Sequence, residues 1–73
     1  MIKKPTQITI TTEYITLGQF LKLADVIESG GEAKSFLAQN EVKIDGVQDN
    51  RRGRKLRGGE IVDVLGQKFE ITK

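Results

Sequence analysis

All four arginines of this sequence lie within residues 51–57, which we call the arginine segment. A guanidinium group can donate two parallel hydrogen bonds to a phosphate or a carboxylate, so clustered arginines indicate a phosphate-bearing or acidic partner. Residues 43–57 carry a net charge of +4, whereas residues 1–42 and 58–73 each carry −1. A nearly neutral body with one positive segment is typical of nucleic-acid-binding proteins.

Catalytic and metal chemistry find little support in the composition. The 73 residues include no histidine and no cysteine, which excludes Ser-His-Asp and Cys-His nucleophiles as well as histidine or thiolate metal sites. The carboxylates are scattered singly, so no nucleophile–base pair can be built from their spacing. We therefore expect no enzyme, no metal, no cofactor and no small-molecule substrate.

The length and the apolar pattern predict one small domain. We expect residues 1–73 to form a single, monomeric domain with a flexible segment at residues 1–6. No apolar run approaches the about 20 residues that span a membrane, and no apolar stretch follows the basic N-terminus as in a secretory signal. We therefore expect a cytoplasmic protein without a membrane partner.

Two helices follow a first strand that we predict at residues 7–14. Thr16 and Gln19 have the spacing of a capping box, so the first helix begins at Thr16, and its apolar stripe continues to residue 27. Gly18 in the first turn lowers the stability of that helix by about 1 kcal/mol relative to Ala, but it permits another backbone to approach closely. Ser29, or alternatively Gly31, is placed to cap a second helix. Asn40 is expected to end that helix in the left-handed conformation.

The remaining sequence predicts β-structure. Asp45-Gly46 between residues 42–44 and 47–48 is a strong hairpin signal, and Leu56 is the one apolar anchor of the arginine segment. A turn is expected at residues 58–59, followed by a buried strand at residues 61–65 and a closing strand after Gly66. The order of elements predicts a small α+β domain.

The stretch from Ser29 to Gly46, SGGEAKSFLAQNEVKIDG, resembles the αL RNA-binding motif, and residues 59–64 resemble the late strand of that motif. The motif is named for the small-subunit ribosomal protein S-four. It recurs in pseudouridine synthases, tyrosyl-tRNA synthetases and a ribosome-associated heat-shock protein. The whole chain is similar to short stand-alone S-four-like bacterial proteins of the YaaA type. The resemblance implies two packed helices against a small, mostly antiparallel sheet of four to five strands.

The resemblance also implies a partner and a surface. The partner would be structured RNA, in particular ribosomal RNA or a ribosomal particle. The surface would combine the second helix, the hairpin that follows it and the arginine segment. Its expected residues are Lys34, Gln39, Lys43, Arg51, Arg52, Arg54 and Lys55, with Gln19, Lys22 and Arg57 as secondary candidates. At position 30 this sequence has Gly where the family usually has Arg.

The mode of binding is predicted to be electrostatic. The spacing of the three phenylalanines places them in the core, which disfavours base stacking and favours recognition of folded RNA through shape and phosphates. Contact with about 4–6 phosphates predicts a log–log salt slope of about −3 to −5. Two alternatives stay open at this point, namely a protein-interaction module that docks an acidic partner and a binder of duplex DNA.

Overall fold

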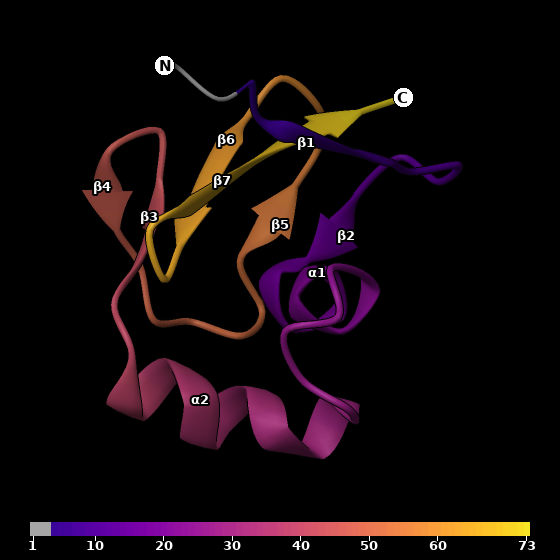
Figure 1. The fold of residues 1–73 in the computed structure, drawn as a ribbon. Coiled ribbons are helices and arrows are strands. Elements are labelled where there is room, and N and C mark those ends of the chain that lie inside the picture. Colours follow the sequence, from indigo (N-terminus) through magenta and orange to yellow (C-terminus); the bar gives the residue numbers. More distant parts are fainter. Residues whose placement is uncertain (1–3) are drawn as a thin grey trace.

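The computed structural model describes residues 4–73 (Figure 1). Of the segment expected to be flexible, residues 1–3 lie outside the described part, and Thr6 is the first residue of a strand. The elements are β1 (Thr6–Thr9), β2 (Ile15–Thr16), α1 (Leu17–Leu23), a 3-10 turn η1 (Gly30–Glu32), α2 (Ala33–Gln39), β3 (Val42–Ile44), β4 (Val47–Gln48), β5 (Lys55–Leu56), β6 (Ile61–Val64) and β7 (Gln67–Thr72).

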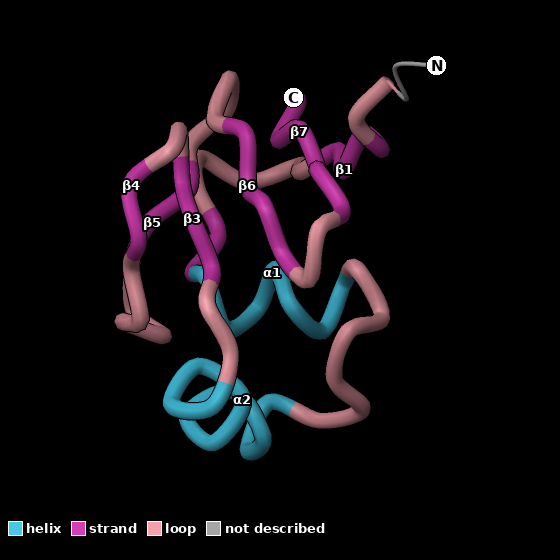
Figure 2. Tube along the Cα trace, turned by 60° about the vertical axis from the view of Figure 1, so that its left-hand side comes forward, coloured by secondary structure: helices cyan, strands magenta, loops and turns pink. Residues whose placement is uncertain are grey.

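The strands form one main sheet and one short ladder. The main sheet has the order β1-β7-β6-β3-β4, in which β1 and β7 are parallel and the other pairs are antiparallel. The short ladder pairs β2 with β5 in antiparallel register, with Ile15 opposite Leu56. Figure 2 shows both helices on the same side of the strands. The predicted α+β fold, with two helices against a mostly antiparallel sheet, is confirmed.

The hydrophobic core lies between the helices and the main sheet. Phe20 of α1 meets Phe69 of β7 edge to face, with the ring centroids 5.3 Å apart. Leu56 is completely buried in the same core, so the expected anchor of the arginine segment is confirmed. Both phenylalanines and Leu56 therefore tie elements distant in sequence to one apolar cluster.

Helix α1 begins as the sequence predicts. The Gln19 N–H donates to Thr16 Oγ1 at 3.3 Å, and the Thr16 N–H donates to Gln19 Oε1 at 2.9 Å, which completes the capping box. The helix nevertheless ends at Leu23, before the predicted stripe does. Asp25 has a left-handed φ of 63°, and Ile27 reaches the core from an irregular segment.

The predicted ends of the second helix are wrong in two respects. Ser29 makes no side-chain cap, because the 3-10 turn of Gly30–Glu32 separates it from α2. Asn40 is extended, with a φ of −131°, instead of left-handed. Its side-chain Nδ2 donates to the Phe36 carbonyl oxygen at 3.1 Å, so the amide side chain satisfies the helix end without a change of handedness.

Two strand predictions also need correction. The first strand ends at Thr9 instead of residue 14, and the chain leaves the sheet after Ile10. Leu65 was expected to be buried, but it is exposed, because it forms the turn between β6 and β7 with a φ of 52°. Asp45 and Gly46 have φ values of 52° and 83°, which confirms the predicted hairpin turn.

No helix within residues 4–73 is long and apolar enough to cross a membrane.

Candidate nucleic-acid interface

The arginine segment is fixed to the beginning of helix α1 by two backbone hydrogen bonds. The Leu17 N–H donates to the Arg54 carbonyl oxygen at 2.7 Å, and the Gly18 N–H donates to that of Arg52 at 2.9 Å. The first N–H groups of a helix have no acceptor within the helix, so these carbonyls satisfy them. A Cβ atom at Gly18 would lie 3.4 Å from the Arg52 oxygen and from Ala33 Cβ. The close approach expected at Gly18 is therefore made by the arginine segment and by α2.

This docking creates a shallow groove between the two helices, which we call the inter-helix groove. It has a volume of about 410 Å³ and brings together the candidates Gln19, Lys22 and Arg52. Its lining residues are Thr16, Gly18, Gln19, Lys22, Gly30, Ala33, Arg52 and Gly53. A Cβ atom at Gly30 or Gly53 would meet nothing within 4 Å, so the backbone is open at both of these lining residues.

Asp49 organises two of the other arginines. Its carboxylate accepts hydrogen bonds from Arg51 Nε at 3.1 Å, from Arg51 Nη2 at 2.8 Å and from the Arg51 N–H at 2.9 Å. Arg54 Nε lies 3.5 Å from the same carboxylate, and Arg54 also donates to the Lys55 carbonyl oxygen. The hydrogen bond from the Arg51 side chain holds the pKa of Asp49 below its ordinary value. Asp49 thus neutralises part of the charge that the sequence suggested.

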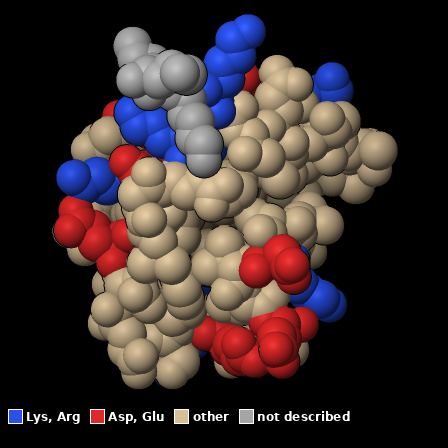
Figure 3. All heavy atoms as spheres, in the orientation of Figure 1, with Lys and Arg blue, Asp and Glu red and all other residues tan. Residues whose placement is uncertain are grey.

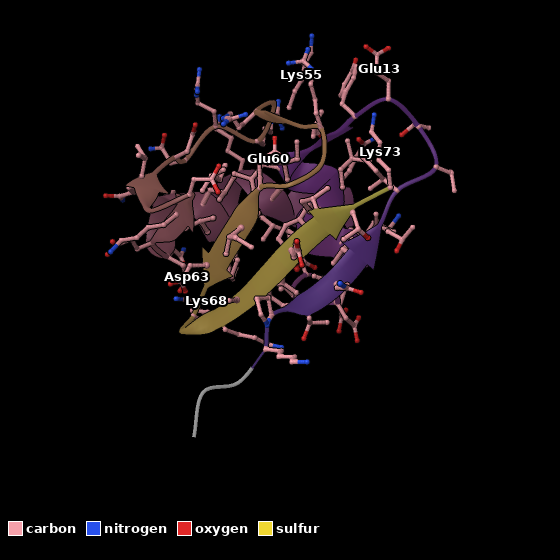
Figure 4. All side chains as sticks on the ribbon, turned by 90° about the horizontal axis from the view of Figure 1, so that it is seen from above. Glu13, Lys55, Glu60, Asp63, Lys68 and Lys73 are labelled. Carbon is pink, nitrogen blue, oxygen red and sulfur yellow. The ribbon has the colours of Figure 1, made fainter. Side chains whose placement is uncertain are left out.

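Lys43 lies on a different face from the inter-helix groove. It alternates with the buried Val42 and Ile44, so its side chain points away from the helices. Its cross-strand neighbour is Asp63, and its Nζ lies 3.3 Å from a carboxylate oxygen of Glu41. Figure 4 shows Asp63 beside Lys68, the partner of Asp63 on β7. The structure does not bring Lys43 together with Arg52.

The remaining candidates do not line the groove. Lys34 and Gln39 are exposed on α2, and Lys34 directly follows the groove residue Ala33. Lys55 Nζ lies 4.9 Å from the centroid of the Tyr14 ring. The Arg57 N–H donates to Glu60, which stabilises the turn at residues 58–59.

Three candidate cations, two in the groove and one on α2, form no ion pair with any residue in the described range 4–73. They are Lys22, Lys34 and Arg52. One acidic residue, the exposed Glu32, lies in the chain between the groove residues Gly30 and Ala33. Figure 3 shows a largely uncharged face with acidic groups over the α1–α2 connection, which contains Asp25 and Glu28.

Sequence reasoning missed the roles of Asp49 and Gly30. An aspartate two residues before an arginine gives no distinctive pattern, and nothing in the sequence shows that Gly30 lies beside Arg52. The signal that could have located the groove is Gly18, because a glycine in a first helical turn indicates that another backbone segment packs against it.

The two helices, the β3–β4 hairpin and the late β6 strand occur in the order of the αL motif. A family model described as the S4 domain matches residues 8–72. The chain belongs to the S4 domain family, and the resemblance predicted from the sequence is confirmed.

The chain is similar to two short proteins and to one part of a longer enzyme. The chain is 63% identical over 59 residues to a Bacillus subtilis protein named "Probable ribosome maturation protein RlbA", covering 81% of this chain and 83% of the relative. It is 33% identical over 59 residues to the "Putative RNA-binding protein YbcJ" of Escherichia coli, covering 81% and 84%. A tyrosine–tRNA ligase of Burkholderia lata is 34% identical over 61 residues, which are 15% of that enzyme. The family and the names of the short relatives indicate a non-catalytic protein.

Proposed function

We propose that this S4 domain is a non-catalytic module that binds structured RNA, and that its target is ribosomal RNA or a ribosome-assembly particle. The contact surface is the inter-helix groove together with the exposed side of α2 and the arginine segment. One observation carries the proposal. The hydrogen bonds from Leu17 and Gly18 fix the arginine segment so that Arg52 lies at the groove with Lys22.

The shape and the charge of this surface support binding through phosphates. Arg52 and Lys22 supply cations that form no ion pair within the described residues 4–73, and the bare backbone at Gly30 and Gly53 leaves room for a sugar–phosphate chain. Helix α2 has only seven residues, and its exposed side offers few base-reading groups for a DNA major groove. Structured RNA, recognised by backbone geometry, therefore fits this surface better than duplex DNA does.

The cations of the inter-helix groove and of α2 set the expected salt dependence of this part of the surface. With Lys22, Lys34 and Arg52 each contacting one phosphate, the log–log slope is about −2 to −3. This slope is shallower than the sequence suggested, because Asp49 pairs with Arg51 and Arg54. A full contribution from those two arginines would require the phosphates to displace Asp49.

The test is a salt titration with an RNA hairpin, a DNA duplex of the same sequence and polyglutamate as an acidic polymer. The variant that combines Lys34→Gln with Arg52→Gln should lose RNA affinity and about two-thirds of the slope. The control variant Lys68→Gln lies on the outer face of the sheet and should bind like the wild type. Equal loss in both variants would refute the assigned surface. Preference for DNA or for polyglutamate would favour one of the two alternatives.

The ribosomal part of the proposal is supported by the names of the relatives and has its own test. The wild-type protein should co-sediment with purified ribosomal subunits or their precursors. The Lys34→Gln, Arg52→Gln variant should stay in the supernatant. We also propose that the chain acts in the cytoplasm as a monomeric single domain. Light scattering after gel filtration would reveal a dimer if the monomer prediction is wrong.

A further inference from the structure

A second and larger groove lies on the other side of helix α1. It has a volume of about 890 Å³, within the range of small-ligand sites. Residues 9–15 line it together with Gln19, Lys22 and Leu23. Gln19 and Lys22 also line the inter-helix groove, so the two grooves meet across the exposed side of α1. A partner bound in the first groove can therefore extend into the second, which we call the Tyr14 groove.

Tyr14 gives this groove an aromatic surface. Its side chain is 38% exposed, whereas Phe20 and Phe69 are buried and Phe36 is half-buried. Within residues 4–73, Tyr14 is thus the most exposed aromatic residue. Lys55 Nζ lies over the ring, 4.9 Å from its centroid, so a cation occupies one face of the aromatic ring.

The other lining groups fit a nucleotide. Among the apolar lining residues, Leu23 is strongly exposed, whereas Ile10 and Ile15 are buried beneath the groove. Three lining threonines add hydroxyl groups, of which that of Thr12 donates to the Tyr14 carbonyl oxygen at 2.8 Å and that of Thr9 is hydrogen-bonded to the Thr72 hydroxyl at 2.9 Å.

One carboxylate, that of Glu13, also lines the Tyr14 groove. Figure 4 shows Glu13 and Lys55 projecting in the same direction, away from the sheet. A carboxylate repels phosphate but accepts hydrogen bonds from the amino group of a base, while the ammonium group of Lys55 attracts phosphate. The pair therefore suits a group with an amino-bearing end and an anionic end.

We propose that the Tyr14 groove holds one unpaired nucleotide of the bound RNA. The base stacks on Tyr14, and the phosphate lies near Lys55 or Lys22. This inference rests on the proposed RNA binding, because Gln19 and Lys22 line both this groove and the inter-helix groove. Stacking on one aromatic side chain is compatible with recognition of structured RNA, since bulges and loops offer single unstacked bases.

The protein carries its own reporter for the test. The chain has one tyrosine and no tryptophan, so its intrinsic fluorescence arises from Tyr14. Two RNAs are compared: a fully paired duplex, and the same duplex with one bulged nucleotide. The bulged RNA should quench the Tyr14 emission more strongly than the paired duplex. It should also bind at least about fivefold more tightly, which is the gain expected from one base–aromatic stack. Tyr14→Phe should keep the preference for the bulge, and Tyr14→Ala should lose it.

The outcomes separate this inference from the proposed function. Equal affinity for the two RNAs, with unchanged Tyr14 emission, would overturn the nucleotide site while Arg52-dependent binding stands. Failure of both RNAs to bind at low salt would overturn both proposals. The emission of the wild-type protein does not depend on a variant, so a folding defect in Tyr14→Ala leaves the test decisive.

Discussion

Gly18 offers a test of whether the arginine segment rests on helix α1. In Gly18→Ala the added Cβ lies 3.4 Å from the Arg52 oxygen and from Ala33 Cβ, a close but tolerable contact. The helix propensity of Ala offsets any strain by up to about 1 kcal/mol. The free energy of unfolding should therefore stay within about 1 kcal/mol of the wild-type value.

Gly18→Val should behave differently. Its two further methyl groups must enter the same narrow space, and overpacking costs about 1–3 kcal/mol. Displacing the Arg52 carbonyl also removes a hydrogen bond worth about 0.5–1.5 kcal/mol. The sum, about 1.5–4.5 kcal/mol, is a large share of the roughly 4–11 kcal/mol expected for a domain of this length. Because Arg52 would leave the groove, RNA affinity should fall as well.

The assay is urea unfolding monitored by far-UV circular dichroism, with RNA affinity measured on the folded variants. Gly30→Val is the matched control, because a Cβ at Gly30 meets nothing within 4 Å. It should unfold close to the wild-type midpoint. If Gly18→Val matches Gly18→Ala in both unfolding midpoint and RNA affinity, the reasoning about the docked arginine segment is refuted.

Three further predictions concern stability, pH and affinity. Leu56→Ala should lower the free energy of unfolding by about 2–5 kcal/mol in urea titrations, whereas Val47→Ala, at a side chain 69% exposed, should change it by no more than about 0.5 kcal/mol; equal effects would contradict the anchoring role of Leu56. Arg51 holds the pKa of Asp49 down, so the stability that Asp49 contributes is present above its unfolded pKa of about 3.9 and is lost as the pH falls through the folded pKa. Unfolding midpoints measured between about pH 5 and pH 2 should therefore fall less in Asp49→Asn, and parallel curves would disprove this linkage. Gly30→Arg should strengthen RNA binding and steepen the salt slope by about 0.7–0.9, and an unchanged slope would place the RNA away from this end of the groove.

Local signals in the sequence predicted much of the fold. The Thr16–Gln19 capping box and the Asp45-Gly46 turn were found because each depends on residues a few positions apart. The Asn40 and Leu65 conformations were missed for a physical reason. At Asn40, a side-chain hydrogen bond to the Phe36 carbonyl oxygen replaces a left-handed cap. Leu65 has an apolar side chain, which suggests burial, but it lies in the turn between β6 and β7.

The candidate site was predicted less completely, because its geometry depends on tertiary packing. The outward direction of Lys43 follows from strand alternation, but only the sheet order shows that this face carries Asp63 instead of the helices. Arg51 and Arg52 are adjacent in the sequence, yet one pairs with Asp49 and the other lies at the inter-helix groove. The number of available cations could therefore not be counted from composition.

The most direct test of the central claim is a map of backbone amide chemical shifts during titration with a structured RNA hairpin. The account predicts that the largest changes occur at the amides of Lys22, Gly30, Arg52 and Gly53, which line the inter-helix groove. It predicts small changes at Lys43 and Lys68 on the outer face of the sheet. If the largest chemical-shift changes occur at those two lysines and the groove amides do not shift, the claim that this S4 domain binds RNA through the groove is contradicted.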